Sequence, residues 1–87
     1  MAKMYERVAC SKGQRMPRIE SDHSIALRSG FKSYIFIPKK FCKIYELPIE
    51  QMPMRWAIDI PKWLIEKNEE LKQTIELINY ENENRYI

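Results

Sequence analysis

The apolar residues of this 87-residue chain change their spacing near Pro61. Before this proline, apolar side chains alternate or cluster over short stretches, which is typical of strands. After it, they recur at intervals of seven, four and three residues among charged ones, which predicts an amphipathic helix. The apolar stripe of this helix consists of Leu64, Leu71, Ile75 and Ile78. A stripe of this kind must pack against another apolar layer.

Two apolar runs separated by a turn signal predict a β-hairpin. The first run, at 24–29, places its apolar residues on one side of an extended chain, and Ser29-Gly30 marks the turn. The second run, at 31–37, is rich in β-branched and aromatic residues and ends at Pro38. Since it is apolar on both faces, the sequence predicts a central strand covered on both sides.

Further strands are predicted at 3–10, 15–20 and 41–45, and the proline-flanked stretch at 47–54 predicts a connector with one short helical turn. The sequence therefore predicts a single α+β domain with a mainly antiparallel sheet of roughly three to five strands, closed over by the carboxyl-terminal helix. The expected boundaries are a sheet at about 3–46, a connector at 47–58, a helix at about 61–79 and a frayed tail at 80–87.

The helix stripe also bears on the oligomeric state. Pro61 suits the first helical position, because it lacks the N–H group that would be unpaired there. If the sheet is too short to cover the far end of the helix, a second copy must cover it. The sequence thus leaves open a homodimer formed through Leu71, Ile75 and Ile78.

Charge is divided unevenly along the chain. Residues 1–43 contain ten Lys and Arg against three acids, whereas residues 44–87 contain five against nine. The basic half fits an anionic partner such as a phosphate backbone, an acidic protein face, or the acidic half of a second copy. The alternative is that these charges form only a solvated surface.

Nothing in the sequence forms an enzyme motif. The only two glycines, Gly13 and Gly30, are isolated, so no phosphate-binding loop is present. His23 beside Asp22 is the only acid–base candidate, and both lie in a polar stretch typical of a turn. We therefore expect no catalytic residue, no cofactor and no enzymatic activity.

The cysteines and the hydropathy further restrict the class of protein that this chain can be. A zinc site would need Cys10, Cys42 and His23 to converge with a carboxylate although no two ligands are paired in sequence, so we expect structural thiols and no metal. No apolar run approaches the roughly 20 residues of a membrane-spanning helix. The amino terminus also has no apolar signal core. We expect a cytoplasmic protein that does not engage a membrane.

Two groups of residues are candidate binding surfaces. An adaptable methionine surface around a tryptophan and an arginine has the composition of an interface, although a tryptophan is more often a core residue. This first group is Met52, Met54, Arg55 and Trp56. Cations interleaved with aromatic residues in the strand region suggest a surface for nucleic acid or for an acidic partner. This second group is Arg18, Arg28, Lys32, Lys39, Lys40 and Lys43.

Three short motifs follow one another along the chain: E-S-D-H-S-I-A-L at 20–27, Y-I-F-I-P-K-K at 34–40 and I-D-I-P-K-W-L-I-E-K at 58–67. Their order resembles small uncharacterised proteins of bacteriophages and other mobile elements, which have an A-I-L strand, a strand ending in I-P-K-S and a helix beginning with I-P-x-W-L. This chain departs from that pattern at Lys40, where serine is usual, in its long connector and in its longer helix. The resemblance implies a compact unit of sheet and helix and implies no catalytic residue.

The sequence therefore favours a small non-enzymatic binding protein of phage or mobile-element type, acting in the cytoplasm of a bacterial host. Such a protein would inhibit or adapt a host protein or nucleoprotein complex, with an anti-defence role as one form of this function. The alternative is a nucleic-acid-binding protein that uses a basic, aromatic sheet surface.

Overall fold

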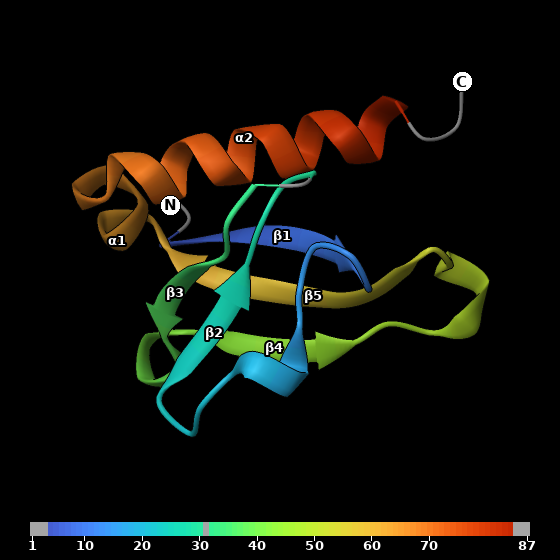
Figure 1. The fold of residues 1–87 in the computed structure, drawn as a ribbon, viewed down its shortest axis with the longest axis horizontal. Helices are drawn as coiled ribbons and strands as arrows, with labels where there is room; N and C mark the ends of the chain where they lie inside the picture. Colours follow the sequence, from blue (N-terminus) through green and yellow to red (C-terminus); the bar gives the residue numbers. More distant parts are fainter. Residues whose placement is uncertain (1–3, 31, 85–87) are drawn as a thin grey trace.

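In the computed structural model, which describes residues 4–30 and 32–84, five strands form two antiparallel sheets beside a long carboxyl-terminal helix (Figure 1). The strands are β1 (Tyr5–Ser11), β2 (Ser24–Leu27), β3 (Ile35–Pro38), β4 (Lys43–Glu46) and β5 (Met54–Pro61). The helices are α1 (Lys62–Lys67), α2 (Glu69–Asn84) and three short 3-10 helices, η1 (Pro17–Ile19), η2 (Lys39–Phe41) and η3 (Ile49–Gln51). The predicted α+β class is confirmed.

The larger sheet has the strand order β1-β5-β4, and one of its faces lines the core. Val8 pairs with Ile58, and both side chains are fully buried. One residue along, Arg7 pairs with Asp59, and Arg7 is exposed on the opposite face. The β2–β3 hairpin crosses in front of the sheet, while α2 runs along its β1 side (Figure 1). The core therefore lies between the sheet, the hairpin and α2.

The predicted hairpin is confirmed as β2 paired with β3, but its strands are shorter than expected. The proposed strand start at Phe31 lies outside the described residues. The expectation that the second strand is covered on both sides is wrong. β3 belongs to a sheet of two strands, where Ile35 and Ile37 face the core and Phe36 is 54% exposed. An apolar residue on the outer face of an edge strand looks, in sequence, like a residue of a buried strand.

The largest departure from the sequence prediction is β5. The connector predicted at 47–58 does contain a helical turn, η3, but from Met54 onward it is the middle strand of the larger sheet. The buried Met54, Ile58 and Ile60 alternate with Arg55 and Asp59, which lie on the outer face, so β5 has the period of a half-buried strand. The prolines around this segment favoured a connector in the sequence, which is why the sheet was expected to end near residue 46.

The other strand predictions have mixed outcomes. The strand at 3–10 is confirmed as β1, with Lys3 outside the described residues. The segment at 41–45 contains β4, although Phe41 belongs to η2. The segment at 15–20 is not a strand: Pro17 begins η1, and Arg15 contributes only an isolated bridge to Leu27. Proline has no N–H for a ladder and suits the first turn of a helix.

The predicted single helix at 61–79 is two helices, because the chain breaks at Asn68. The Oδ1 atom of Asn68 accepts a hydrogen bond of 3.1 Å from the N–H of Leu71, which caps the amino end of α2. α2 then continues to Asn84, so a frayed tail beginning at residue 80 is wrong as far as 84. Residues 85–87 of that predicted tail lie outside the described residues.

Side-chain hydrogen bonds hold the carboxyl-terminal turn of α2 against β1. The Nδ2 atom of Asn82 donates to the carbonyl of Ala9 at 2.8 Å. Gln14, which is buried, donates from Nε2 to Glu81 and to Asn82, each at 3.0 Å. These contacts explain why a polar segment that reads as a fraying end is helical.

The apolar stripe of the helix faces the core as predicted. Leu71 and Ile78 are fully buried and Ile75 is 2% exposed. Each such side chain contributes about 1.5–3 kcal/mol relative to an exposed one. A homodimer through these three residues is wrong, because the sheet and hairpin of the same chain already cover them. Within the described ranges, no helix is long and apolar enough to span a membrane.

Candidate binding surfaces

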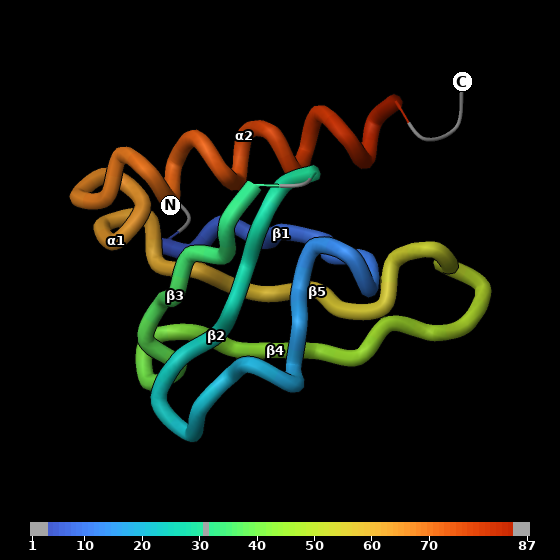
Figure 2. The backbone as a smooth tube through the Cα atoms, viewed as in Figure 1, coloured from blue at the N-terminus to red at the C-terminus, as the bar shows by residue number. Residues whose placement is uncertain are grey.

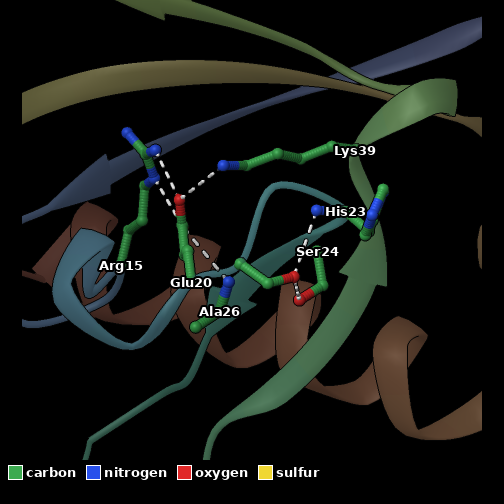
Figure 3. A network of polar contacts seen from close by, with 7 residues as sticks. Arg15, Glu20, His23, Ser24, Ala26 and Lys39 are labelled. Carbon is green, nitrogen blue, oxygen red and sulfur yellow. Dashed lines mark hydrogen bonds and ion pairs between the residues drawn. The ribbon is translucent and has the colours of Figure 1, made fainter.

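A buried ion pair joins the segment after β1 to the start of the hairpin (Figure 3). Arg15 donates to both carboxylate oxygens of Glu20, from Nε at 2.8 Å and from Nη2 at 2.7 Å. The N–H of Ala26 donates to the same carboxylate at 3.1 Å. The side chains of Arg15 and Glu20 are only 10% and 3% exposed. The fork geometry and the backbone donor together satisfy a carboxylate that is almost removed from water.

The ionisation of Glu20 reflects this arrangement. Burial alone would raise the pKa of the Glu20 carboxyl, but the hydrogen bonds from Arg15 and Ala26 lower it, and so do the charges of Arg15 and Lys39. The net result is a pKa below the ordinary value of glutamate. Glu20 is therefore a stable anion in the folded protein, and it fixes the position of the cations around it.

Lys39 extends this network to η2. Its Nζ atom lies 3.6 Å from Glu20 Oε1, and its backbone N–H donates to the carbonyl of His23 at 2.9 Å. The N–H of His23 donates to Ser21 Oγ, which in turn contacts Ser24 Oγ at 3.0 Å (Figure 3). The polar turn and η2 are thus held side by side.

An open hollow of about 570 Å³ lies where the polar turn meets η2. It is lined by Asp22, His23, Pro38, Lys39 and Lys40. Beside it, Phe41 and Trp63 pack edge to face with their ring centroids 5.0 Å apart, and Lys40 Nζ lies 4.9 Å from the centroid of Phe41. The hollow and the aromatic pair form one continuous surface, because Lys40 belongs to both.

The residues considered for catalysis and for a metal do not form a cluster. Over 4–30 and 32–84, the imidazole of His23 makes no hydrogen bond or ion pair, and it lines the open hollow together with Asp22. In the same ranges, no three His, Cys, Asp or Glu side chains gather closely enough to hold a metal ion. Cys10, Cys42 and His23 are therefore not ligands of a common described site.

The two thiols are free and shielded. Burial raises the pKa of Cys10 to about 12 and the pKa of Cys42 to about 11. For Cys10, Arg15 lowers the pKa and Glu20 raises it, but both effects are smaller than that of burial. Since the thiolate is the reactive form, neither group is an activated nucleophile at neutral pH.

A second surface is the loop between β4 and β5, which projects from one end of the molecule (Figure 2). Ile49 and Met52 on this loop are 79% and 51% exposed. Backbone hydrogen bonds hold its shape: Met52 N–H donates to the Ile49 carbonyl at 3.1 Å, and Leu47 N–H donates to the Arg55 carbonyl at 2.9 Å. The Met52–Pro53 peptide bond is cis. A hollow of about 320 Å³ is lined by Leu47, Ile49, Met52 and Arg55.

The residues predicted as a partner surface are divided by this geometry. Met52 is exposed on the loop and Arg55 is exposed at the start of β5, but Met54 is 8% exposed and faces inward. Trp56 is half-buried against the core, with the guanidinium carbon of Arg15 4.8 Å from its ring centroid. The prediction missed Ile49. The sequence contained a signal for it, because the isoleucine after Pro48 lies in a loop and belongs neither to the alternating pattern of a strand nor to the stripe of a helix.

The basic residues predicted as one surface are spread over several. Arg28 is half-buried at the hairpin end, where its Nε donates to the Gly13 carbonyl at 3.1 Å. Lys43 lies in register with Asp59 on the larger sheet. Lys39 and Lys40 lie together on η2, while Arg18 lies on η1 and Lys32 in the loop before β3. Over 4–30 and 32–84 these residues therefore do not form a single basic, aromatic sheet surface. Lys40 lies beside the exposed rings of Phe41 and Trp63, whereas Arg28 lies over the half-buried ring of Tyr34 at 4.6 Å.

The outer face of the larger sheet carries a smaller polar cluster. Arg7 donates to Asp59 from Nε at 2.8 Å and from Nη2 at 3.0 Å, and its guanidinium lies 4.8 Å from the ring centroid of Tyr45. The hydrogen bond from Arg7 lowers the pKa of Asp59 below its ordinary value. Because the Arg7 side chain is 62% exposed, water screens this pair far more than it screens Arg15 and Glu20.

Comparison of the chain with protein-family models, with curated proteins and with solved structures finds no significant match.

Proposed function

We propose that this protein is a non-enzymatic binding protein of phage or mobile-element type, which inhibits or adapts a host protein or nucleoprotein complex in the bacterial cytoplasm. Its docking element is the β4–β5 loop, defined by residues 47–53. An anti-defence role is one form that such binding would take. The observation that carries the proposal is the exposure of Ile49 and Met52 on a projecting loop whose backbone is hydrogen-bonded.

Leaving these two apolar side chains in water costs free energy unless a partner covers them. Isolated apolar side chains on a surface are normal, but two on one protruding loop, above a hollow that also contains Leu47, form a patch. Covering each would contribute about 1.5–3 kcal/mol of transfer free energy. A protein partner with an apolar pocket of matching size would gain most of this contribution.

The shape of the loop also favours binding. Pro48 precedes η3, Pro53 follows it, and backbone hydrogen bonds close the turn between them. A loop already held in one conformation loses little conformational entropy when a partner binds it. The adjacent Arg55, with its side chain in the same hollow, adds a cation that suits an acidic group at the rim of the partner pocket.

The test is capture of a partner from bacterial lysate by the immobilised protein, compared between matched variants. Ile49→Asp places a charge at the tip of the loop and should abolish capture of the specific band. Ile19→Asp is the control, because Ile19 is 47% exposed on η1, away from the loop. Circular dichroism should show that both variants are folded. Equal capture by the wild type and Ile49→Asp would contradict the proposal.

A further inference from the structure

The end of the molecule opposite the β4–β5 loop has a surface of different chemistry. η2 and α1 lie at that end, and the loop projects from the other (Figure 2). Phe41 of η2 and Trp63 of α1 are 37% and 44% exposed, although their rings contact each other at an interplanar angle of 78°. Two large aromatic rings in contact, each with more than a third of its area in water, are a characteristic feature of recognition surfaces.

A cation and an open hollow adjoin these rings. Lys40 lies over Phe41 and also lines the hollow that contains His23 and Asp22. The volume of this hollow, about 570 Å³, falls within the range of sites that hold small organic groups. The surface therefore offers aromatic faces, a cation, and hydrogen-bonding groups within one continuous area.

The charges around the hollow favour an anionic ligand. Lys39 and Lys40 are the cations of its lining, and Asp22 is the only acid there among the described residues. The nearby charge of Glu20 is balanced by Arg15, which donates to both of its oxygens. Anions are therefore attracted to this end of the molecule.

We infer that the surface formed by Lys40, Phe41, Trp63 and the adjoining hollow is a binding site for single-stranded nucleic acid. Unpaired bases stack on the exposed rings of Phe41 and Trp63, and Lys40 neutralises a backbone phosphate. The hollow holds a neighbouring nucleotide, where the Asp22 carboxylate accepts from exocyclic amino groups and His23 supplies a further polar contact. Duplexes are poor ligands, because their base faces are already stacked on one another.

The composition favours nucleic acid over a lipid surface. Membrane-binding elements bury a broad apolar face and have cations around it. Here the apolar area comprises the two rings and part of the lining of the hollow, and the polar groups of Asp22 and His23 lie at the same hollow. Placing these groups at the acyl boundary would remove a carboxylate from water with no described partner.

The test is a titration with a fluorescently labelled, mixed-sequence single strand of about 15 nucleotides, as DNA and as RNA, by anisotropy at rising salt. Binding is expected at about 0.05 M salt and should weaken by about threefold for each phosphate contact by about 0.2 M. Lys40→Gln should reduce the slope of log affinity against log salt by about 0.7, the value for one phosphate contact on a single strand. Phe41→Ala should weaken binding roughly tenfold, from the loss of one stacking partner.

Controls distinguish this site from general attraction of anions. Tyr80→Ala removes an exposed aromatic ring from α2, and Lys72→Gln removes an exposed cation from the same helix; both should bind as the wild type does. Tryptophan fluorescence should fall on binding, and Trp63→Phe should eliminate that change while the half-buried Trp56 remains. Lys40→Gln and Trp63→Phe are mild changes at exposed positions, so the test does not depend on Phe41→Ala remaining folded.

Several results would overturn the inference. These are no binding at the lowest salt, equal affinity for duplex DNA, an unchanged salt slope in Lys40→Gln, or the same loss in Tyr80→Ala as in Phe41→Ala. Binding to anionic lipid vesicles or to polyglutamate as strong as binding to the single strand is a further such result. It would show that the surface binds anions of another class, and it would overturn the inference of a nucleic-acid site.

Discussion

Replacing Glu20 by glutamine should destabilise the fold far more than any loss of a surface ion pair. Glu20 is 3% exposed at its side chain and accepts hydrogen bonds from Arg15 at 2.8 and 2.7 Å and from Ala26 at 3.1 Å. In Glu20→Gln the neutral amide has one acceptor oxygen for these donors. The guanidinium of Arg15, itself only 10% exposed, then lacks a counter-charge.

The magnitude follows from the burial. Breaking one partner of a buried ion pair costs about 3–5 kcal/mol, mostly because the other charge is left uncompensated. The lower end applies here, since glutamine retains part of the hydrogen bonding and Arg15 still stacks on Trp56 at 4.8 Å. A chain of 87 residues has a total stability of about 4–13 kcal/mol, so the loss is a large fraction of the whole. The exposed pair between Arg7 and Asp59 should be worth about 0–1 kcal/mol.

Urea denaturation of the wild type, Glu20→Gln, Arg15→Met and the double variant measures the coupling. Because the double variant removes both buried charges and leaves only the partly exposed Lys39 without its partner, it should be less destabilised than the sum of the single variants by at least about 1 kcal/mol. A cost below about 1 kcal/mol for Glu20→Gln, or strict additivity in the cycle, would show that the pair behaves as a surface pair and would refute the reasoning.

The same variant changes the dependence of stability on pH. The folded-state pKa of Glu20 lies below the unfolded value, so the unfolded state binds the proton more readily. This contribution to stability is complete above the ordinary glutamate pKa of about 4.3 and is lost as the pH falls through the lower folded value. Glu20→Gln should therefore flatten the acid side of the stability profile. The part due to Asp59, whose pKa is also lowered, should remain.

Three further substitutions or reactions test the fold. Ile78→Ala, at a fully buried position of α2, should lower the free energy of unfolding by about 2–5 kcal/mol. Ile19→Ala at the surface should change the free energy of unfolding little. Equal effects of the two variants in denaturation would contradict the packing of α2 on the sheet. Asn68→Ala should cost about 1 kcal/mol, because the cap of α2 is lost, and unchanged thermal stability would show that Asn68 does not cap it. Cys10 should resist a thiol reagent at pH 8 in the native protein and react after unfolding, because burial raises its pKa to about 12. Rapid labelling of Cys10 in the native protein would contradict its burial.

The spacing of apolar residues in the sequence predicted some elements of the fold and missed others. The stripe of α2 and the β2–β3 hairpin follow from spacing and from a turn at Gly30, whose φ is +54°. β5 was missed although its sequence alternates, because Pro53 and Pro61 at its ends favoured a connector. The division of the helix at Asn68 depends on a local cap, in which Asn68 accepts from the N–H of Leu71, and apolar spacing alone does not reveal it. The helical turn at Asn82 depends on a hydrogen bond to the distant Ala9, which no local pattern marks.

The binding surfaces were less predictable for the same reason. Basic residues that are close in sequence point in different directions once the hairpin and the larger sheet form, so only Lys39 and Lys40 remain together. The contact of Phe41 with Trp63 joins residues 22 positions apart, and no local pattern marks it. In contrast, the exposed Ile49 was readable as an apolar residue in a loop limited by prolines.

Together, the two proposals describe an adaptor with a protein-binding loop at one end and a site for single-stranded nucleic acid at the other. The rigid core between them positions both ends, because β4 leads into the loop and η2 leads into β4. A single molecule can then hold a host protein on a nucleic acid, which is one way to inhibit or redirect a nucleoprotein complex.

The most direct measurement of this claim is a bridging assay on an immobilised single-stranded oligonucleotide. Bacterial lysate, freed of nucleic acid by precipitation and with its nucleases inhibited by EDTA, is passed over the oligonucleotide with the wild type, with Ile49→Asp or with Lys40→Gln, and the retained proteins are compared. The adaptor account predicts a host protein that is retained with the wild type and lost with Ile49→Asp while the adaptor stays bound. With Lys40→Gln, the host protein and the adaptor should be reduced together, and more strongly at about 0.05 M salt than at higher salt. Retention of the same host proteins with all three forms, or without any of them, would contradict it.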